Sequence, residues 1–369
     1  MHSEPLNRAR LNLSKPLKKS PHKILVIPLR YIGDTILTVP LLRNLRRLFP
    51  QAQIDVLASR VSAPLLEPCP YVDQVLLEPK SSLARLKLLT GNGYDTVFLL
   101  RKSVSMAWLC QMAGIPNRIG YDKQRFPWGY KRWGWFLSHQ ARYPSLRTDV
   151  PQPVSHLGLL SACRLQIQDD FLELWSTPED ENRVDAILEQ HGLNARSDAQ
   201  PEPLRLAALH AASASHGKQV ELGKFIPSLQ ALHTAGYQIL CTGTPVDFEG
   251  YEALSRDAGI SITNLAGKTT LRETFALYKR LQLLLTVDSS PIHMGAAAEV
   301  PSIVGVFGPT NHVQWGPHNA QVQFQPVYMD LPCRPCYAKV CEHNNCRTLL
   351  TGEQIALAVA QGMATKPNS

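Results

Sequence analysis

The alternation of short apolar runs with helical patterns constrains the fold of this chain more than any other feature. The run at 23–29 is almost continuously apolar, as in strands that are buried on both faces. Gly33 and Asp34 interrupt it, and residues 35–49 then carry apolar side chains at helical spacing. A strand, a tight turn and a helix form the opening unit of a doubly wound parallel sheet.

The same alternation continues along the chain and predicts an α/β fold with two parallel sheets. At 369 residues the chain exceeds the size of one ordinary hydrophobic core, which favours two domains. Further strands are predicted at 53–58, 74–77, 96–100, 204–210, 237–241, 281–287 and 302–307, and further helices at 103–113, 224–234, 248–257 and 271–280.

The composition of the sequence changes between the two sets of strands. Thr177-Pro-Glu-Asp is a helix-start signal, and residues 198–203 are rich in proline, glutamine and glutamate. We therefore predict four parts, namely a basic mobile tail (1–22), an N-terminal Rossmann-like domain (23–170), an interdomain linker region (171–203) and a C-terminal Rossmann-like domain (204–369).

The charge balance indicates a soluble protein that attracts polyanions. The formal net charge is +8, which suits nucleic acid, anionic lipid headgroups or a phosphorylated glycan. Neither an apolar stretch of about 18 residues nor an export signal is recognisable, so we expect a cytoplasmic protein. The eight cysteines are then expected to be reduced thiols.

Polar side chains that follow the predicted strands are the first candidates for a site, because open parallel sheets bind ligands beyond the carboxyl ends of their strands. Asp34 follows the first strand and is expected at a helix N-terminus. After the strand at 204–210, a loop of small residues offers hydroxyls and a lysine that suits a diphosphate. The candidates in and beyond this loop are Ser213, Ser215, Lys218 and Asp247.

The segment after the strand at 281–287 carries the densest group of candidates. Asp288 comes directly from the buried strand, and a helix rich in glycine and alanine then begins. The free N–H groups of such a helix can hold phosphate oxygens. Ser289, Ser290 and His293 would lie at the same place.

Three motifs together resemble glycosyltransferase family nine, which contains the ADP-heptose:lipopolysaccharide heptosyltransferases. They are Arg30-Tyr-Ile-Gly-Asp-Thr-Ile-Leu-Thr-Val-Pro with the apolar run before it, Arg118-Ile-Gly-Tyr, and Thr286-Val-Asp-Ser-Ser-Pro-Ile-His-Met-Gly-Ala-Ala followed by Phe307-Gly-Pro-Thr. The resemblance spans residues 23–360 and implies the GT-B fold, in which two Rossmann-like domains face each other. It also implies that residues 23–170 form the acceptor domain and residues 204–369 the nucleotide-sugar domain.

The resemblance also implies an activity and roles for the candidates. The expected reaction is an inverting transfer of heptose from ADP-heptose to the inner core of lipopolysaccharide, with Asp34 as general base. Lys218 and the hydroxyls near Ser213 would contact the diphosphate, and Asp247 would lie near the nucleotide. The remaining donor contacts would come from Asp288, Ser289, Ser290 and His293.

The resemblance further implies a lipid A-core acceptor at the inner face of the cytoplasmic membrane, reached by electrostatic contact with anionic lipid, and no required cofactor. The candidates for acceptor phosphates and carboxylates are basic residues of the first domain: Arg60, Arg101, Lys102, Arg118 and Arg125. The chain departs from the family pattern at Gln219-Val-Glu and at Ser290. A member with another donor, or with a capsule or O-antigen acceptor, is therefore the main alternative.

A cluster of cysteines near the C-terminus supports two other readings. Cys333, Cys336, Cys341 and Cys346 have the spacing C-x2-C-x4-C-x4-C, which four thiolates of a structural zinc site could adopt. Reduced thiols without metal are the alternative, and no catalytic metal is expected. The cluster, the net charge and the aromatic-basic stretch at 125–135 also fit a nucleic-acid-binding protein, but that class does not explain two Rossmann-like halves.

Overall fold

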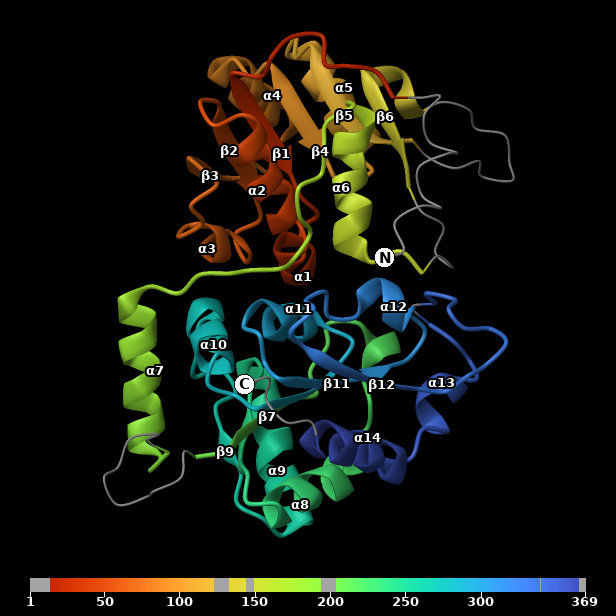
Figure 1. The fold of residues 1–369 in the computed structure, drawn as a ribbon. Helices are drawn as coiled ribbons and strands as arrows, with labels where there is room; N and C mark the ends of the chain where they lie inside the picture. Colours follow the sequence, from red (N-terminus) through yellow and green to blue (C-terminus); the bar gives the residue numbers. More distant parts are fainter. Residues whose placement is uncertain (1–13, 123–132, 144–148, 194–203, 339, 365–369) are drawn as a thin grey trace. The chain divides into compact units, whose positions relative to one another are not determined.

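The computed structural model describes residues 14–122, 133–143, 149–193, 204–338 and 340–364 (Figure 1). The chain forms two compact units, one comprising Met1–Ser145 and Gln152–Phe171 and the other comprising Leu146–Pro151 and Leu172–Ser369. Residues 146–151 are thus grouped with the second unit, although the chain before them and α6 (Gln152–Ala162) after them belong to the first.

The first unit is built on a six-stranded sheet in the order β3-β2-β1-β4-β5-β6, and all its strand pairs are parallel. This is the strand order of a Rossmann fold, as the sequence predicts. The strands are β1 (Lys23–Ile27), β2 (Gln53–Ala58), β3 (Gln74–Leu77), β4 (Thr96–Leu99), β5 (Asn117–Asp122) and β6 (His139–Arg142).

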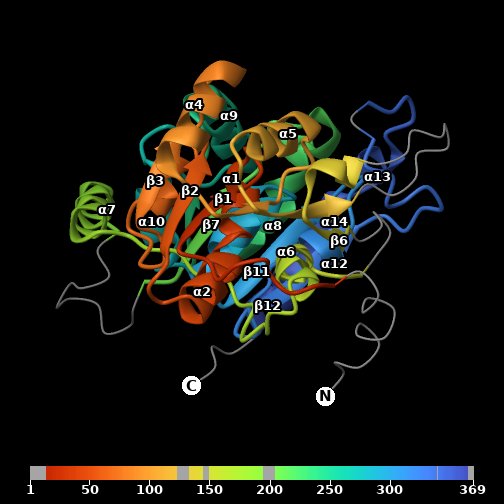
Figure 2. The ribbon, with the colours of Figure 1, turned by 90° about the horizontal axis from the view of Figure 1, so that it is seen from above.

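Helices cover both faces of this sheet (Figure 2). Buried side chains of α4 and α5, among them Leu89 and Leu109, pack with Leu25 and Val97 of the strands. On the other face α6 lies against α2 and against β5 and β6. The helices of the unit are α1 (Ile32–Ile36), α2 (Val39–Leu48), α3 (Ala63–Leu66), α4 (Ser82–Asn92), α5 (Val104–Met112), α6 and the 3-10 turn η1 (Trp133–Phe136).

The single helix predicted at 35–49 is in fact two helices. α1 ends at Ile36 and α2 begins at Val39, with Pro40 in its first turn. Proline has no N–H to donate to the carbonyl four residues earlier, which is that of Ile36, so a continuous helix would lose a bond there. The break confines Asp34 to a short helix of its own.

The second unit repeats the architecture with a sheet in the order β12-β11-β10-β7-β8-β9, again with parallel pairs. Its core lies between the strands and the helices α8, α9 and α14. The strands are β7 (Leu206–His210), β8 (Gln238–Cys241), β9 (Thr263–Asn264), β10 (Leu283–Val287), β11 (Ser302–Phe307) and β12 (Gln323–Tyr328).

The region predicted as a linker contains α7 (Pro178–Gln190), which packs on α10. Arg272 donates to Asp180 at 2.9 Å, and Lys279 donates to Glu181 at 2.7 Å. The other helices and 3-10 turns of this unit are α8 (Ile226–Thr234), α9 (Phe248–Ala258), α10 (Leu271–Tyr278), α11 (Ser290–Ala297), α12 (His312–Trp315), α13 (Asn345–Thr348), α14 (Gly352–Ala364), η2 (His216–Lys218), η3 (Leu222–Phe225) and η4 (Pro245–Asp247).

The end of the segment predicted as a mobile tail is bonded to the first unit. The backbone N–H of Lys15 donates to the carbonyl of Ala162 at 3.2 Å, and that of Lys18 donates to Asn117 Oδ1 at 2.9 Å. Residues 1–13 lie outside the described part of the chain. Of the helices described, none has the length and apolar character needed to cross a bilayer.

Candidate active site

The carboxyl ends of β7 and β10 bring together two residues that the sequence predicts for donor binding. These strands are neighbours, with Thr286 opposite His210, so the segments that follow them meet at one edge of the sheet. Lys218 Nζ lies 2.9 Å from Asp288 Oδ2, and the hydroxyl of Thr310 donates to the same oxygen. The Asp288 side chain is only 3% exposed, whereas Lys218 is 26% exposed and accessible to an anion.

His293 lies one turn into α11 and is buried beside this cluster. Burial and, to a smaller extent, the charge of Lys218 lower its pKa from 6.5 to about 3, which keeps the ring neutral. Its Nδ1 is buried and has no hydrogen-bond partner among the described residues. The ring centroid of Trp315 is 6.5 Å from that of His293, so an aromatic wall adjoins the polar cluster.

The remaining predicted donor residues lie in the same unit, where local hydrogen bonds involve Ser213, Ser215, Ser289 and Asp247. Ser213 Oγ accepts from the Ser215 N–H at 3.3 Å, and Ser289 Oγ donates to the Val287 carbonyl at 3.3 Å. Ser290 is the first residue of α11. Asp247 is the last residue of η4 and completes the capping box of Thr244, accepting from the backbone N–H and the hydroxyl of Thr244 at 2.7 Å each. Its carboxylate is therefore engaged in a turn.

Asp34 lies in the first unit, after β1, as the third residue of α1. It is buried, with 8% exposure, and the residue that precedes the helix is Tyr31. The hydroxyl of Thr38 donates to the Asp34 carbonyl at 2.8 Å and so ties the start of α2 to α1. The predicted base thus occupies the first turn of a short helix, where free N–H groups favour negative charge.

A buried line of polar groups that the sequence did not indicate supports the junction between α1 and α2. His156 Nδ1 lies 3.0 Å from the carbonyl of Leu37, and its Nε2 lies 2.9 Å from Gln152 Nε2. Tyr143 in turn donates to Gln152 Oε1 at 3.3 Å. The Leu37 carbonyl can only accept, so Nδ1 carries a proton. The amide nitrogen of Gln152 can only donate, so Nε2 accepts and the ring is neutral. Burial lowers the pKa of His156 to about 4, in agreement with this state.

We expect the first unit to lose stability in mild acid because of His156. The folded-state pKa of about 4 lies below the usual 6.5, so the unfolded chain takes up the proton first. The free energy of unfolding is therefore unaffected by this group above pH 6.5 and decreases as the pH drops towards 4. The decrease due to His156 is about 3 kcal/mol in total. Unfolding temperatures between pH 7.5 and 4.5 should fall less steeply in His156→Gln than in wild type. The exposed His22→Gln is the control, and equal slopes in all three proteins would contradict the expectation.

The predicted acceptor residue Arg101 belongs to a cluster around Glu78, a residue that no sequence motif marks. Arg101 and Arg30 each make two hydrogen bonds of 2.9 Å with this carboxylate, and Arg85 Nε is 3.2 Å from it. Burial alone would raise the pKa of Glu78, but Arg30 and Arg101 lower it to about 2. Three guanidinium groups against one carboxylate leave an excess of positive charge beyond β3 and β4.

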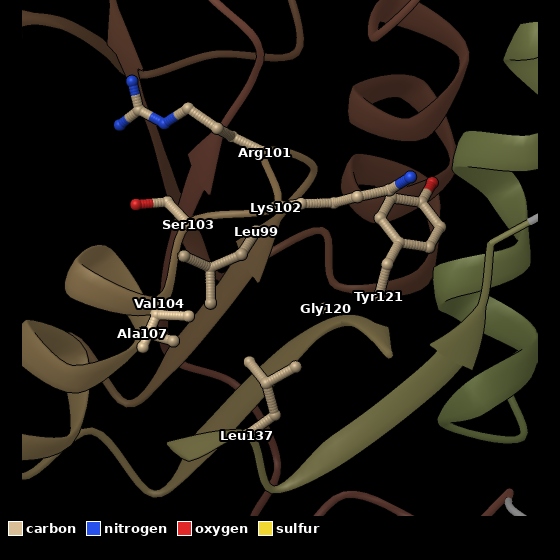
Figure 3. Close-up of a pocket in the computed structure, with 9 residues that line it drawn as sticks. All are labelled: Leu99, Arg101, Lys102, Ser103, Val104, Ala107, Gly120, Tyr121 and Leu137. Carbon is tan, nitrogen blue, oxygen red and sulfur yellow. The ribbon is translucent and has the colours of Figure 1, made fainter. Parts of the chain in front are cut away.

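Lys102 lines a pocket at the ends of β4 and β5 (Figure 3). Its amino group lies over the ring of Tyr143, 3.1 Å from the centroid, and extends towards Tyr121, whereas Arg101 points the other way. The lining consists of Leu99, Arg101, Lys102, Ser103, Val104, Ala107, Gly120, Tyr121 and Leu137. The lining is mostly apolar, and Arg101 and Lys102 supply its positive charge.

The other predicted acceptor residues are not gathered here. Arg118 is the second residue of β5 and thus lies at the amino end of the strand, the wrong edge of the sheet for a ligand. Its guanidinium donates to the carbonyls of Phe136, at 2.6 Å, and Ile115, which is a structural role. Arg60 is exposed just after β2, and Arg125 lies outside the described residues.

The four clustered cysteines are free thiols in the second unit. Cys333, Cys336 and Cys341 are exposed, and burial raises the pKa of the half-buried Cys346. Throughout the described ranges, no group of three or more histidine, cysteine or acidic side chains is placed to hold a metal ion. The geometry therefore does not form the tetrahedral thiolate site that the spacing allows.

Two doubly wound parallel units, with charged residues at the carboxyl ends of their strands, are the architecture of the GT-B glycosyltransferases. The chain belongs to glycosyltransferase family 9, the heptosyltransferase family, whose model matches residues 83–347. It is 26% identical over 323 residues to lipopolysaccharide heptosyltransferase 3 of Escherichia coli, covering 83% of this chain and 90% of that protein.

Solved structures confirm the fold. A family 9 glycosyl transferase from Veillonella parvula has a TM-score of 0.73 at 21% identity and covers 96% of this chain, with 99% of that chain covered. The ADP-heptose lipopolysaccharide heptosyltransferase II of E. coli has a TM-score of 0.68 at 21% identity and covers 93% of this chain, with 100% of that chain covered.

Proposed function

We propose that this protein is an inverting glycosyltransferase that moves a heptose from ADP-heptose to the inner core of lipopolysaccharide. The observation that carries the proposal is the cluster of Lys218, Asp288 and Thr310 directly before the first turn of α11. A half-buried lysine and free helix N–H groups at one strand edge suit a diphosphate. The choice of ADP-heptose and of the lipopolysaccharide core is supported by the names of the relatives.

In the proposed reaction each unit supplies one function. Asp34 of the first unit removes the proton of an acceptor hydroxyl as its oxygen attacks the anomeric carbon of the heptose. The bond between that carbon and the diphosphate oxygen breaks on the opposite face, which inverts the configuration. Lys218 and the N-terminus of α11 stabilise the charge that develops on the departing ADP. The proposal requires no metal or other cofactor, because these groups supply the positive charge.

The charge of the first unit supports an anionic acceptor. The arginines around Glu78 and the amino group of Lys102 offer positive charge to phosphates or carboxylates of a lipid A-core oligosaccharide. The net charge of +8 favours peripheral contact with the anionic inner face of the cytoplasmic membrane, where such an acceptor is anchored. The proposed attachment is electrostatic and reversible.

A panel of nucleotide sugars tests the donor. At about 100 times its dissociation constant a ligand stabilises the folded state by about 2.7 kcal/mol, so ADP-heptose should raise the unfolding temperature clearly. UDP-sugars should not, and ADP-heptose with a heptose-deficient core acceptor should give a glycosylated product. Protection by a UDP-sugar and none by ADP-heptose would reject the proposed donor. It would favour a family member that builds capsule or O-antigen.

A further inference from the structure

We call Lys218, Asp288 and Thr310 the donor cluster. Residues 333–347, the cysteine segment, contact the loops that carry this cluster through Arg334 and Arg347. Arg334 Nε donates to the carbonyl of Gly308 at 2.6 Å, and its Nη2 donates to the carbonyl of Thr310 at 2.7 Å. The side chain of Thr310 bonds in turn to Asp288. Arg334 therefore fixes the backbone of Thr310, whose side chain is a partner of Asp288.

Arg347 makes the corresponding contact with the loop that carries Lys218. Its Nη1 donates to the carbonyls of His216 and Gln219 at 2.7 and 2.9 Å, and these two carbonyls flank Lys218 in the sequence. Lys224 donates to the main-chain carbonyl of Arg347 at 2.8 Å and holds that residue in turn. Hydrogen bonds from a charged donor are about twice as strong as neutral ones, so both loops are firmly fixed.

The two loops that the arginines hold also lie against each other. A Cβ atom on Gly308 would come within 2.9 Å of the carbonyl oxygen of Gly217, so only glycine permits this approach. The backbone N–H groups of Cys336 and Tyr337 both donate to the carbonyl of Pro309, at 3.0 and 3.1 Å. The cysteine segment thus binds the main chain of both loops where they meet.

We infer that Arg334 and Arg347 are positioning residues of the donor site, and that the cysteine segment serves to hold Lys218 and Thr310 in place around Asp288. Groups that are already ordered bind an anion without the entropic cost of being ordered by it. Removing either arginine should therefore weaken the binding of a nucleoside diphosphate, although neither guanidinium is assigned a contact with it. The inference rests on the proposed function, since it takes Lys218 to bind the diphosphate.

The test compares ADP affinities of full-length variants by titration calorimetry, with unfolding temperatures measured in parallel. Arg334→Ala and Arg347→Ala should each weaken ADP binding by about tenfold or more, because each loses two charge-assisted bonds to the carbonyls of a donor-site loop. Arg205→Ala is the matched control: like Arg334, Arg205 stacks on a tyrosine (4.1 Å from the Tyr237 centroid, against 4.4 Å from Tyr328) and donates to main chain. It lies at the amino end of β7, and its ADP affinity should equal that of wild type.

Lysine variants separate positioning from general stability and serve if an alanine variant fails to fold. In Arg347 a single nitrogen makes both carbonyl bonds, so the one ammonium of Arg347→Lys should recover an ADP affinity within about threefold of wild type. In Arg334 the two bonds come from different nitrogens, so Arg334→Lys should stay about tenfold weaker.

The outcomes distinguish a failure of the positioning role from a failure of the proposed donor site. If Lys218→Ala weakens ADP binding but the Arg334 and Arg347 variants match Arg205→Ala, the positioning role is wrong and the proposed site stands. Lower unfolding temperatures with unchanged ADP affinity would likewise reduce the arginines to a structural role. If Lys218→Ala binds ADP like wild type, the proposed donor site itself is wrong and the inference falls with it.

Discussion

Asp34→Asn is expected to reduce transfer by about 10²- to 10⁴-fold while leaving ADP binding unchanged, because the amide keeps the shape of the carboxylate but cannot accept a proton. Asp34 is buried in the first turn of α1, so an isosteric change should be tolerated by the fold. The donor cluster is in the other unit, and the loss should therefore appear in kcat with little change in ADP affinity.

Asp55→Asn is the matched control for this variant. Asp55 is a fully buried aspartate of the same unit, and it accepts a hydrogen bond of 2.7 Å from Tyr94. Its loss should affect the unfolding temperature more than the rate of transfer. If Asp34→Asn retained more than about a tenth of the wild-type activity, Asp34 would be rejected as the base.

Lys218→Ala should weaken ADP binding by about tenfold to a hundredfold, since a charge-assisted hydrogen bond contributes about 1.5–3 kcal/mol. Adenosine has no diphosphate and should lose much less affinity. Asp288→Ala should also weaken ADP binding, because it removes the carboxylate that holds both Lys218 and Thr310. Calorimetric titration of both ligands into each variant checks this pattern.

Lys279→Ala provides the comparison for a lysine of the same unit that is also paired with a carboxylate. Its ammonium lies 2.7 Å from Glu181, on the α7–α10 contact. Removing this charge should leave ADP affinity as it is in wild type. Unchanged affinity in Lys218→Ala and Asp288→Ala as well would place the nucleotide elsewhere on the protein.

Much of the fold could be predicted because buried parallel strands are continuously apolar. The run at 302–307 was predicted at the bounds that the structure gives to β11. The strand β5 (Asn117–Asp122) was missed because it begins with polar residues and contains Gly120, so it has neither an apolar run nor alternation. Without that strand, the sequence could not show that Arg118 lies at the amino edge of the sheet.

Part of the candidate site could be predicted because ligands bind beyond the carboxyl ends of the strands in an open parallel sheet. Lys218 and Asp288 were both expected at the donor site, and the adjacency of β7 and β10 brings them together. Glu78, His156 and Arg347 were not expected. Their roles depend on partners far away in the sequence, such as His216 for Arg347 and Leu37 for His156, and no local pattern marks such pairs.

The passage of the chain back into the first unit after residue 151 bears on any attempt to separate the two halves. Asp149 contacts Asn311 of the second unit at 3.5 Å, whereas α6 begins three residues later in the first. A cut after residue 145 would remove α6, with its buried Leu157 and Leu160, from the N-terminal fragment. It would also remove Asp169, the partner of Arg43. A single proteolytic nick there would therefore yield two incomplete fragments. A fragment that contains the whole first unit has to extend to residue 171. It then includes residues 146–151, which are grouped with the second unit, without the rest of that unit.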